Sequence, residues 1–446
     1  MSLSEAPLSA PVRHLAIVAG GRGTRMAGVA DDLPKALVAV GGKPVLQHQL
    51  ECAAASGIEA VTIFAGHLAH RIAAFVGDGS RFGLRVKVEV ETTPLGTAGA
   101  VLQALDTLPE HFFIVYGDVM LAVDLAAMGR RHVERTADFT TFVHPNDHPH
   151  DSDLLEIDEQ GWVVAVYRYP HPEGVFLPNL VNAALYVARR DALRSIGRGG
   201  NRDFMQHVLA PLGVSGRRVL AYRSREYVKD MGTPDRLEQV TRDLRDGKLD
   251  RGAAHLPAPT VFLDRDGTIN EERGFLASHD ELELVPGAGR ALRRLRDGGF
   301  RLLMVTNQPV IARGDACEEE VDTIHRRLAW ELGKHGAYLD DIYLCPHHPD
   351  SGFPGERPEL KGPCDCRKPG TGMFERARRD HPLDVGRSWM VGDRTADIEF
   401  ARRTGLRSIL VRTGAAGKDG KYAAVPNHVA ADLGEAAEIV LASTPP

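Results

Sequence analysis

Two aspartates, Asp264 and Asp266, stand one residue apart directly after a short apolar run at 260–263. Residues that alternate along an extended chain lie on the same side of it, so the two carboxylates can share a divalent cation. Carboxylates beside a hard cation suit phosphate chemistry, in which one attacks phosphorus and the other protonates the leaving oxygen. Gly267 permits the sharp turn that follows. The pair could instead cap the next helix, and both interpretations stay open at this point.

Three later segments carry polar groups that fit the same chemistry. An expected strand ends in Thr306, and the hydroxyl of this residue, with the amide of Asn307, could hold phosphate oxygens. Lys368 could offset the charge that develops during phosphoryl transfer. Asp393 follows another expected strand and is suited to Mg²⁺. Taken singly, each of these is also an ordinary turn or surface residue.

Three of the five cysteines lie near one another in the sequence, together with a histidine pair. Three thiolates and one imidazole suit tetrahedral Zn²⁺ with no open position, which indicates a structural site. Its ligands would be Cys345, His347, Cys364 and Cys366, with His348 as the alternative to His347. Cysteines without metal remain the other interpretation. Because Lys368 follows closely, such a site would position it over a bound phosphate.

A glycine-rich stretch follows the first expected strand near the N-terminus. Gly20, Gly21 and Gly23 would let backbone N–H groups approach a polyphosphate, and Arg25 adds a planar cation for its oxygens. Lys35 lies where it could reach the same phosphates. Tight turns use glycine without any ligand too, but the two cations favour the phosphate-binding interpretation.

Two further segments could complete a nucleotide site. In the stretch 91–100, Gly96 and Gly99 leave room for a flat base against the backbone. Asp118 and Asp230 each follow or end an expected strand. If both strands belong to one sheet, the two carboxylates could bind a single Mg²⁺ that bridges nucleotide and sugar phosphates. Each aspartate alone could equally be a helix cap or a turn residue.

Short apolar runs alternate with helical patterns along the chain, which predicts α/β domains with mainly parallel, doubly wound sheets. The polar stretch 246–259 contains Gly and Pro and lacks periodicity, so we expect a linker there. The alternation then restarts. We therefore predict one domain at 1–245 and a second at 260–446. Expected elements are 14–19, 44–56, 60–65, 84–90, 97–105 and 112–116 in the first, and 260–263, 288–298, 301–305, 318–335, 341–344, 372–379, 388–391, 395–404 and 407–411 in the second.

The composition is that of a globular protein of 446 residues, 43% hydrophobic and 26% charged. It contains no apolar run of about 18 residues, so we expect no membrane span. The net charge is −6 without a basic block, which gives nucleic acid no attraction. The N-terminus lacks the pattern of a signal peptide, so we expect a cytoplasmic protein, in which clustered cysteines suit a metal better than disulfides.

The N-terminal segments, in their order and spacing, resemble the sugar-1-phosphate nucleotidyltransferases over nearly all of residues 13–245. The resemblance implies a Rossmann-like, GT-A-like domain in which a sugar 1-phosphate attacks the α-phosphorus of a nucleoside triphosphate and expels pyrophosphate. It implies that Asp118 and Asp230 hold Mg²⁺ and that Asn182 contacts the sugar. The triphosphate would be held by Gly20, Gly21, Gly23, Thr24, Arg25 and Lys35, and the base would lie against Leu95, Gly96 and Thr97.

Within this family the likeness is strongest to mannose- and heptose-1-phosphate guanylyltransferases, which favours GTP. Glu91 could accept hydrogen bonds from N1–H and the exocyclic amine of guanine, although a surface glutamate at a strand end is the alternative. Many of these enzymes have a Glu-Lys-Pro triplet where this chain reads Arg168-Tyr169-Pro170. The role of the missing lysine would pass to Arg168 or Lys229.

The C-terminal segments resemble the haloacid dehalogenase (HAD) superfamily of phosphatases across residues 260–440. The resemblance implies that Asp264 is the nucleophile, that Asp266 is the general acid and base, and that Thr306 and Lys368 bind the phosphoryl group. Asp264, Asp266 and Asp393 would form the Mg²⁺ site, supported by Asp397.

With the cysteine cluster, the likeness extends to the D-glycero-D-manno-heptose 1,7-bisphosphate phosphatases, and histidinol-phosphate phosphatases are similar. Two departures bear on the fit of the substrate. The family's Ser-Gly-Ile-Ala-Arg-Gly is here Pro309-Val310-Ile311-Ala312-Arg313-Gly314, and the loop between His347 and Cys364 is longer than expected.

The two resemblances together suggest consecutive steps, because one enzyme type yields a sugar 1-phosphate and the other consumes one. We hypothesise a bifunctional enzyme that removes the 7-phosphate of the bisphosphate and then makes nucleotide-activated heptose, with GTP as the expected donor. One alternative is a histidinol-phosphate-type phosphatase fused to a mannose- or hexose-1-phosphate nucleotidyltransferase. Another is a phosphatase regulated by a nucleotide-sugar-sensing domain without catalysis.

Overall fold

The computed structural model describes residues 12–21, 33–197, 200–251, 253 and 256–443. The chain divides into two compact units. The N-terminal unit comprises Met1–His144, Leu155–Tyr167 and Asn182–Ala254, and the C-terminal unit comprises Pro145–Leu154, Arg168–Val181 and His255–Pro446. A short helix, α8 (Lys248–Arg251), lies inside the stretch for which we expected a linker. None of the described helices combines the length and the apolar character that a membrane span needs.

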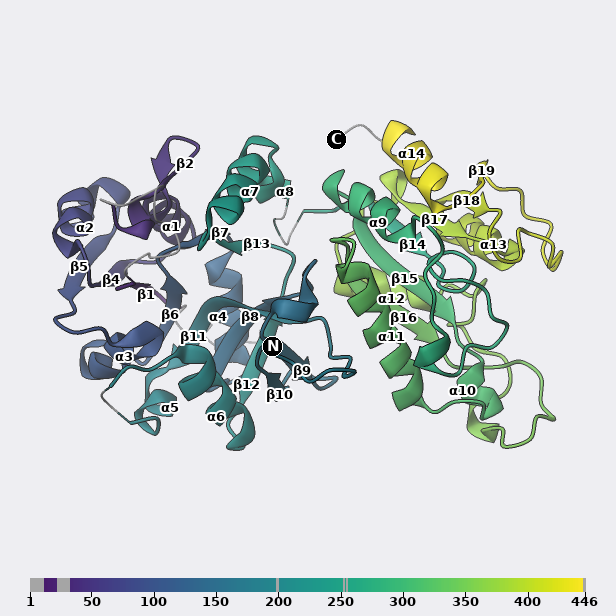
Figure 1. The fold of residues 1–446 in the computed structure, drawn as a ribbon, viewed down its shortest axis with the longest axis horizontal. Coiled ribbons are helices and arrows are strands. Elements are labelled where there is room, and N and C mark those ends of the chain that lie inside the picture. The colour runs from purple at the N-terminus through teal and green to yellow at the C-terminus, as the bar shows by residue number, and fades with distance from the viewer. Residues whose placement is uncertain (1–11, 22–32, 198–199, 252, 254–255, 444–446) are drawn as a thin grey trace, which may run out of the picture. The chain divides into compact units, whose positions relative to one another are not determined.

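A mixed sheet forms the centre of the N-terminal unit (Figure 1). Strands β6, β1, β4 and β5 are parallel neighbours in that order, and β11 joins the edge of β6 in the antiparallel sense. The expected α/β class is therefore confirmed for this unit. The strands of this sheet are β1 (His14–Ala19), β4 (Ala60–Ala65), β5 (Arg85–Val90), β6 (His111–Tyr116), β8 (Phe139–His144), β9 (Leu154–Ile157), β10 (Val163–Tyr167), β11 (Val181–Arg189) and β12 (Val219–Arg223).

Alternate residues of these strands point to opposite faces of the sheet, which decides what packs on each face. Leu15 and Ile17 of β1 belong to a buried cluster with Leu46, Ile72 and Met128 from three helices. Such runs, apolar on both faces, are typical of parallel strands covered on both sides. The helices of the unit are α1 (Val45–Ala55), α2 (Ala69–Val76), α3 (Gly96–Gln103), α4 (Leu125–Glu134), α5 (Arg190–Arg194), α6 (Ala210–Val214), α7 (Pro234–Arg245) and α8.

The expectation that Asp118 and Asp230 end strands of one sheet is wrong. After β6 the chain turns at Gly117 and enters β7 (Val119–Ala122), which pairs with β13 (Tyr227–Asp230) in a separate two-stranded sheet. A second small pair joins β2 (Ala39–Val40) to β3 (Lys43–Pro44). The two aspartates are neighbours all the same, because Met231 N donates a hydrogen bond to Asp118 O over 2.9 Å. A strand-end carboxylate in the sequence does not reveal which sheet its strand joins.

The C-terminal unit is built on a parallel sheet in the order β16-β15-β14-β17-β18-β19. The strands are β14 (Thr260–Leu263), β15 (Arg301–Asn307), β16 (Asp341–Cys345), β17 (Trp389–Gly392), β18 (Arg407–Val411) and β19 (His428–Ala430). The helices are α9 (Ala288–Asp297), α10 (Val310–Arg313), α11 (Glu318–Gly333), α12 (Gly372–Asp380), α13 (Thr395–Thr404) and α14 (Leu433–Ser443). Parallel strands need crossover connections, and these helices supply them.

Helices cover both faces of this sheet, as the sequence predicts. Val261 and Leu263 of β14 pack in one buried cluster with residues of α9, α11 and α14, whereas Phe262 packs in a second cluster with residues of α12 and α13. The carboxyl ends of all these strands meet at one edge. In an open α/β sheet this edge is where ligands bind.

Candidate functional sites

The structure brings the predicted residues of the C-terminal unit together at the carboxyl edge of the sheet. Asp264 follows β14, Thr306 lies at the end of β15, and Asp393 follows β17, which are three adjacent parallel strands. All three side chains are buried. Asp264, Asp393 and Asp397 each offer a carboxylate oxygen within 4.8 Å of the others. The sequence named these residues, and the parallel register places them side by side.

Lys368 lies between two of these carboxylates. Its Nζ is 2.7 Å from Asp264 Oδ1 and 2.7 Å from Asp397 Oδ1, and all three side chains are buried. Burial alone would lower the pKa of Lys368, but the two carboxylates outweigh it and raise the pKa, so the ammonium stays charged. One cation thus balances part of the negative charge at the centre of the site.

The carboxylate of Asp393 has a geometry that suits a cation ligand. Its Oδ2 accepts a hydrogen bond from Ala415 N over 2.6 Å, whereas Oδ1 is buried without a hydrogen-bond partner among the described residues. Burial, followed by the charges of Asp264 and Asp397, raises the pKa of Asp393 to about 8. Burial also raises the pKa of Asp264 to about 6, against the effect of Lys368. A hard divalent cation such as Mg²⁺ fits this crowded oxygen set.

Asp266 lies in a different environment from Asp264. Its carboxylate accepts hydrogen bonds from Arg265 Nη2 at 2.9 Å, Asn270 Nδ2 at 2.9 Å and Gln308 Nε2 at 2.8 Å. Burial would raise its pKa, but Arg265 and these hydrogen bonds outweigh that effect and lower the pKa. The pKa of Asp264 is therefore raised and that of Asp266 lowered, and such a difference is typical of two carboxyl groups with different roles.

The sequence reasoning assigned no role to Arg265, Asn270 and Gln308, all of which are buried at this site. Arg265 also contacts Gln308 Oε1 at 2.9 Å and His325 Nε2 at 3.3 Å, so it ties the loop after β14 to the loop after β15 and to α11. The sequence offered two signals for these roles: a charged residue between the two aspartates and a glutamine two positions after Thr306. Neither reveals a side chain that folds back toward Asp266.

The amide of Asn307 holds the backbone that carries Lys368. Its Oδ1 accepts a hydrogen bond from Lys368 N over 2.9 Å, and its Nδ2 donates to Lys368 O over 3.2 Å. Thr306 lies beside it and accepts a hydrogen bond from Gln308 Nε2 over 2.8 Å. The predicted phosphate ligands Thr306 and Lys368 are thus placed at one site, with Asn307 as the residue that links them.

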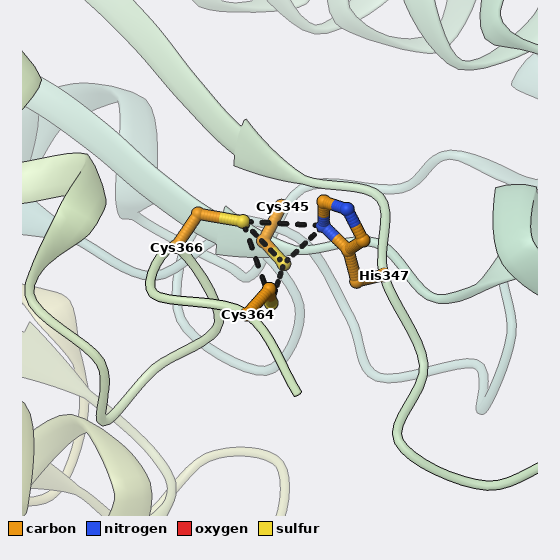
Figure 2. A group of neighbouring side chains, drawn as sticks. All are labelled: Cys345, His347, Cys364 and Cys366. Carbon is orange, nitrogen blue, oxygen red and sulfur yellow. Dashed lines mark hydrogen bonds between the residues drawn. The ribbon is translucent and has the colours of Figure 1, made fainter. Parts of the chain in front are cut away.

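The cysteine cluster is assembled around a common centre (Figure 2). Cys366 Sγ lies 3.1 Å from Cys345 Sγ, 3.6 Å from Cys364 Sγ and 3.2 Å from His347 Nδ1. Ligands at the zinc–sulfur distance in a tetrahedron are separated by about 3.8 Å, so the observed arrangement is only slightly more compact. The donor set of three sulfurs and one imidazole nitrogen fits Zn²⁺.

The structure also distinguishes between the two histidines of this segment. His347 Nδ1 faces the three sulfurs (Figure 2), whereas His348 Nδ1 accepts a hydrogen bond from Asp350 N over 3.0 Å. Arg367 Nη1 donates to His347 O over 3.0 Å. Since Lys368 follows Arg367 directly, the cluster and the phosphate site are joined through one short segment.

In the N-terminal unit, the predicted nucleotide segments line a cavity of about 620 Å³. Gly20, Gly21, Lys35 and Asp118 form one part of its lining. Lys35 Nζ lies 3.2 Å from Asp118 Oδ2, with both side chains largely buried. Three predicted phosphate ligands, Gly23, Thr24 and Arg25, lie outside the described residues.

Leu95, Gly96 and Thr97 line the same cavity at the start of α3. A second segment that the sequence analysis did not single out fixes this turn. Gly96 has φ +74°, and a Cβ there would lie 2.3 Å from Arg202 O, so the close approach requires glycine. Thr97 Oγ1 donates to Asp203 Oδ2 over 2.9 Å. No pattern in the sequence connects 201–204 with the turn that they support.

Glu91 also lines the cavity and lies against the first glycine. Its Oε1 is buried without a partner among the described residues, and a Cβ on Gly20 would come within 2.5 Å of it. Burial raises the pKa of Glu91. A buried acceptor without a donor, placed in a cavity, is an observation that a surface glutamate would not produce.

The other predicted residues of this unit have partners within the protein. Asp230 accepts hydrogen bonds from Arg236 Nη1 at 2.7 Å to each oxygen, so Arg236 is a neighbour that the sequence analysis missed. Asn182 Oδ1 accepts from Thr141 Oγ1 over 2.8 Å, and its Nδ2 donates to Tyr186 OH over 2.8 Å. Two carboxylates, Asp118 and Asp230, remain a suitable oxygen set for Mg²⁺.

Comparison with known proteins finds relatives of both parts of the chain. A family model described as nucleotidyl transferase matches residues 15–247, and one described as HAD-hydrolase-like matches residues 365–436. The D-glycero-beta-D-manno-heptose-1,7-bisphosphate 7-phosphatase of Haemophilus ducreyi is 42% identical over 158 residues, which are 35% of this chain and 84% of that protein. The chain belongs to the nucleotidyl transferases and, C-terminally, to this phosphatase family.

Two further similarities concern the phosphatase part. The D-glycero-D-manno-heptose-1,7-bisphosphate 7-phosphatase of Thermosynechococcus vestitus is 40% identical over 190 residues, which are 41% of this chain and 95% of that protein. A solved D,D-heptose 1,7-bisphosphate phosphatase from B. bronchiseptica, complexed with magnesium and phosphate, is 32% identical. The similarity covers 42% of this chain and 99% of that one, with a TM-score of 0.37. The protein is a bifunctional phosphatase and nucleotidyltransferase.

Proposed function

We propose that the protein removes the 7-phosphate of D-glycero-D-manno-heptose 1,7-bisphosphate and then transfers a guanylyl group from GTP to heptose 1-phosphate. The observation that carries the proposal is the presence of both sites in one chain, with phosphatase relatives named for this bisphosphate. We assign the transfer to residues 1–245 and the hydrolysis to residues 260–446. The hydrolysis yields a sugar 1-phosphate, which is the class of substrate that the transfer uses.

In the hydrolysis, the carboxylate of Asp264 attacks the phosphorus of the 7-phosphate. Lys368 Nζ donates a hydrogen bond to Asp264 Oδ1 over 2.7 Å and so orients the carboxylate. The sugar oxygen leaves with a proton from Asp266, and the phosphoryl group remains on Asp264 as an aspartyl phosphate. Asp266 then takes a proton from water, whose oxygen attacks phosphorus, releases phosphate and restores the Asp264 carboxylate. The lowered pKa of Asp266 supports this second step, because it favours the carboxylate that accepts the proton.

Mg²⁺ would be held by Asp264 and Asp393, with Asp397 and Asp266 nearby, and would neutralise charge on the phosphoryl oxygens. The buried Oδ1 of Asp393, which has no hydrogen-bond partner within the described ranges, supports this assignment. Thr306 and Lys368 bind the phosphoryl oxygens from the protein side. Zn²⁺ in the Cys345, His347, Cys364 and Cys366 cluster would be structural, because four protein ligands leave no open position.

A bisphosphate needs a second cationic group beyond the reacting phosphate, and Arg313 is a candidate. Its guanidinium lies 3.9 Å from the ring centre of Phe275 and 4.3 Å from that of Phe353. Phe275, Arg313 and Phe353 follow β14, β15 and β16, so all three loops leave the sheet at the edge that holds Asp264. A planar cation held between two rings suits recognition of a phosphate.

In the transfer, the phosphate of the sugar attacks the α-phosphorus of GTP, and pyrophosphate leaves. Lys35 supports the triphosphate, together with the glycine-rich loop, and Asp118 and Asp230 would hold Mg²⁺. Glu91 supports guanine as the base, because its carboxylate, whose Oε1 has no partner among the described residues, can accept from N1–H and the exocyclic amine together. Lys229, on β13 of the same unit, is the candidate for binding the sugar phosphate.

The test is a ³¹P NMR time course on the heptose 1,7-bisphosphate with Mg²⁺, with GTP added only after the first reaction stops. We expect loss of the 7-phosphate signal, then pyrophosphate and a nucleotide-diphosphate signal after GTP. An untouched bisphosphate would overturn the heptose assignment, and histidinol phosphate would be tested next. If phosphate leaves and GTP is inert, ATP, CTP and UTP would show whether the donor or the transfer itself was wrongly assigned.

A further inference from the structure

The segment 413–422, which follows β18, donates hydrogen bonds to Asp393, the proposed cation ligand that follows β17. Ala415 N donates to Asp393 Oδ2 over 2.6 Å, and Gly417 N donates to Asp393 O over 2.7 Å. Thr413 Oγ1 donates to Gly267 O over 2.6 Å, in the turn that follows the two aspartates of the nucleophile loop. The segment therefore contacts both of the loops that carry the cation ligands.

This contact is close enough to fix the orientation of the carboxylate. A Cβ on Gly414 would lie 2.3 Å from Asp393 Oδ2, and a Cβ on Gly267 would lie 2.5 Å from the same atom. Both glycines have positive φ, of +58° and +77°. Two backbone segments thus enclose Oδ2 and fix its position, whereas Oδ1 has no hydrogen-bond partner in the part of the chain that the structure describes.

Asp419 connects the segment to the helix that follows Asp393. Its Oδ1 accepts a hydrogen bond from Thr395 N over 2.9 Å, and its Oδ2 accepts from Thr395 Oγ1 over 2.7 Å. Thr395 is the first residue of α13, so its N–H is one of those that have no partner within the helix. Tyr422 N also donates to Thr395 Oγ1, over 3.2 Å. The carboxylate of Asp419 caps the helix from another segment and anchors that segment to it.

We propose that Asp419 is a positioning residue for the divalent cation of the phosphatase. It fixes 413–422 against Thr395, this segment places the N–H of Ala415 on Asp393 Oδ2, and Asp393 then presents Oδ1 together with Asp264. The loss of this kind of outer hydrogen bond weakens metal sites by about 10- to 100-fold. The inference rests on the Mg²⁺ site in the proposed function.

The test measures Mn²⁺ binding, as a probe for Mg²⁺, by the electron paramagnetic resonance signal of free Mn²⁺. It uses the full-length, zinc-loaded chain without nucleotide. The site is identified as the Mn²⁺ that is lost in Asp393→Asn. Asp419→Asn removes the charge and one acceptor, whereas Thr395→Val removes only the hydroxyl and keeps the Asp419 charge. Asp432→Asn is the matched control, because Asp432 Oδ1 likewise accepts a helix N–H, from Glu435 over 3.0 Å in α14.

We expect the Kd for Mn²⁺ to rise by about 10-fold or more in Asp419→Asn and in Thr395→Val, and to stay unchanged in Asp432→Asn. The double variant should be no weaker than the single ones, because both changes break one contact. Thermal unfolding before Mn²⁺ is added shows whether each variant is folded.

Unchanged Kd values in both variants would overturn the role of Asp419. A rise in Asp419→Asn alone would also overturn it, because the effect would then come from charge and not from position. If the wild-type protein has no Mn²⁺ site that Asp393→Asn removes, the Mg²⁺ assignment itself fails and this inference falls with it. These results separate the two proposals.

Discussion

Lys368 Nζ lies 2.7 Å from Asp264 Oδ1 in a site where both side chains are buried. The residue that we propose to bind the phosphoryl group and the residue that we propose as the nucleophile are therefore held together by a direct ion pair. Asp397 Oδ1 also lies 2.7 Å from this ammonium, so the lysine is paired with two carboxylates.

Replacing Lys368 with Met should lower kcat of the phosphatase by about 10²- to 10³-fold, because a preorganised charge next to the phosphoryl group is lost. The measurement is phosphate release at saturating substrate. The matched control is Lys334→Met, which removes an exposed lysine paired with Glu331 at 2.8 Å in the same unit. Equal activities of the two variants would contradict the role of Lys368.

Cation binding at the phosphatase site should strengthen as pH rises. The pKa values of about 6 for Asp264 and about 8 for Asp393 mean that Mg²⁺ must displace protons below pH 8. We expect the association constant to rise by about tenfold per pH unit for each proton displaced, between about pH 6 and 8. Isothermal titration calorimetry at pH 6, 7, 8 and 9 measures this. A constant that does not change across this range would contradict the assignment.

The same pKa values predict how the stability of the Mg²⁺-free protein varies with pH. A carboxyl group with a raised folded-state pKa contributes stability that is full below its unfolded pKa, near 4, and is lost as pH rises through the folded values of about 6 and 8. Added Mg²⁺ should therefore raise Tm more at pH 8.5 than at pH 6. Thermal unfolding with and without Mg²⁺ at the two pH values checks this, and an equal increase would contradict it.

The cysteine cluster should support hydrolysis and not transfer. Cys364→Ser should release Zn²⁺ and lower phosphatase activity by about tenfold or more, since the cluster positions Arg367 and Lys368 through His347. Transfer measured as pyrophosphate release should stay unchanged. Zinc content and both activities are measured, with Cys317→Ser, outside the cluster, as the control. A variant that loses Zn²⁺ and keeps full phosphatase activity would show that the cluster has no such role.

Of the two reactions, only nucleotidyl transfer should depend on Asp118. Asp118→Ala should reduce pyrophosphate release by about 10³-fold, because a ligand of the catalytic metal is lost, and should leave phosphate release intact. Asp264→Asn is the reciprocal control and should do the opposite. Full pyrophosphate release in Asp118→Ala would contradict the metal role, and a wild-type protein without any release would favour a domain that only senses nucleotide sugars.

Glu91 should determine the preference for guanine. Glu91→Gln should raise KM for GTP by about 10- to 100-fold, which corresponds to hydrogen bonds to a charged acceptor worth about 1.5–3 kcal/mol. The KM for ATP should change little. Glu89→Gln is the control, because Glu89 lies on β5 two residues before Glu91 and is paired with Lys87. If the KM values for both nucleotides change equally, Glu91 contributes to folding or to the phosphate site and not to base recognition.

The sequence was informative where chemistry is local. Asp264, Thr306 and Asp393 each follow or end an apolar strand, and parallel strands bring such ends to one edge whatever the details of the fold. The α/β class, which periodicity predicts, is confirmed. The pairing of a transferase with a phosphatase, which the resemblance of short motifs to two families implies, is confirmed too. The roles of the individual site residues stay predictions.

The tertiary structure decided what depends on contacts between distant segments. It placed Asp230 in the small sheet of β7 and β13, folded Arg265 back onto Asp266, and turned His347 toward the sulfurs. It also brought Asp419 to Thr395 and the 201–204 segment to Gly96. The sequence by itself determined which side chains could do the chemistry, because a motif carries its residue types. Only the fold determined what holds them in place, because those partners come from distant segments and have no fixed spacing in the sequence relative to the motif.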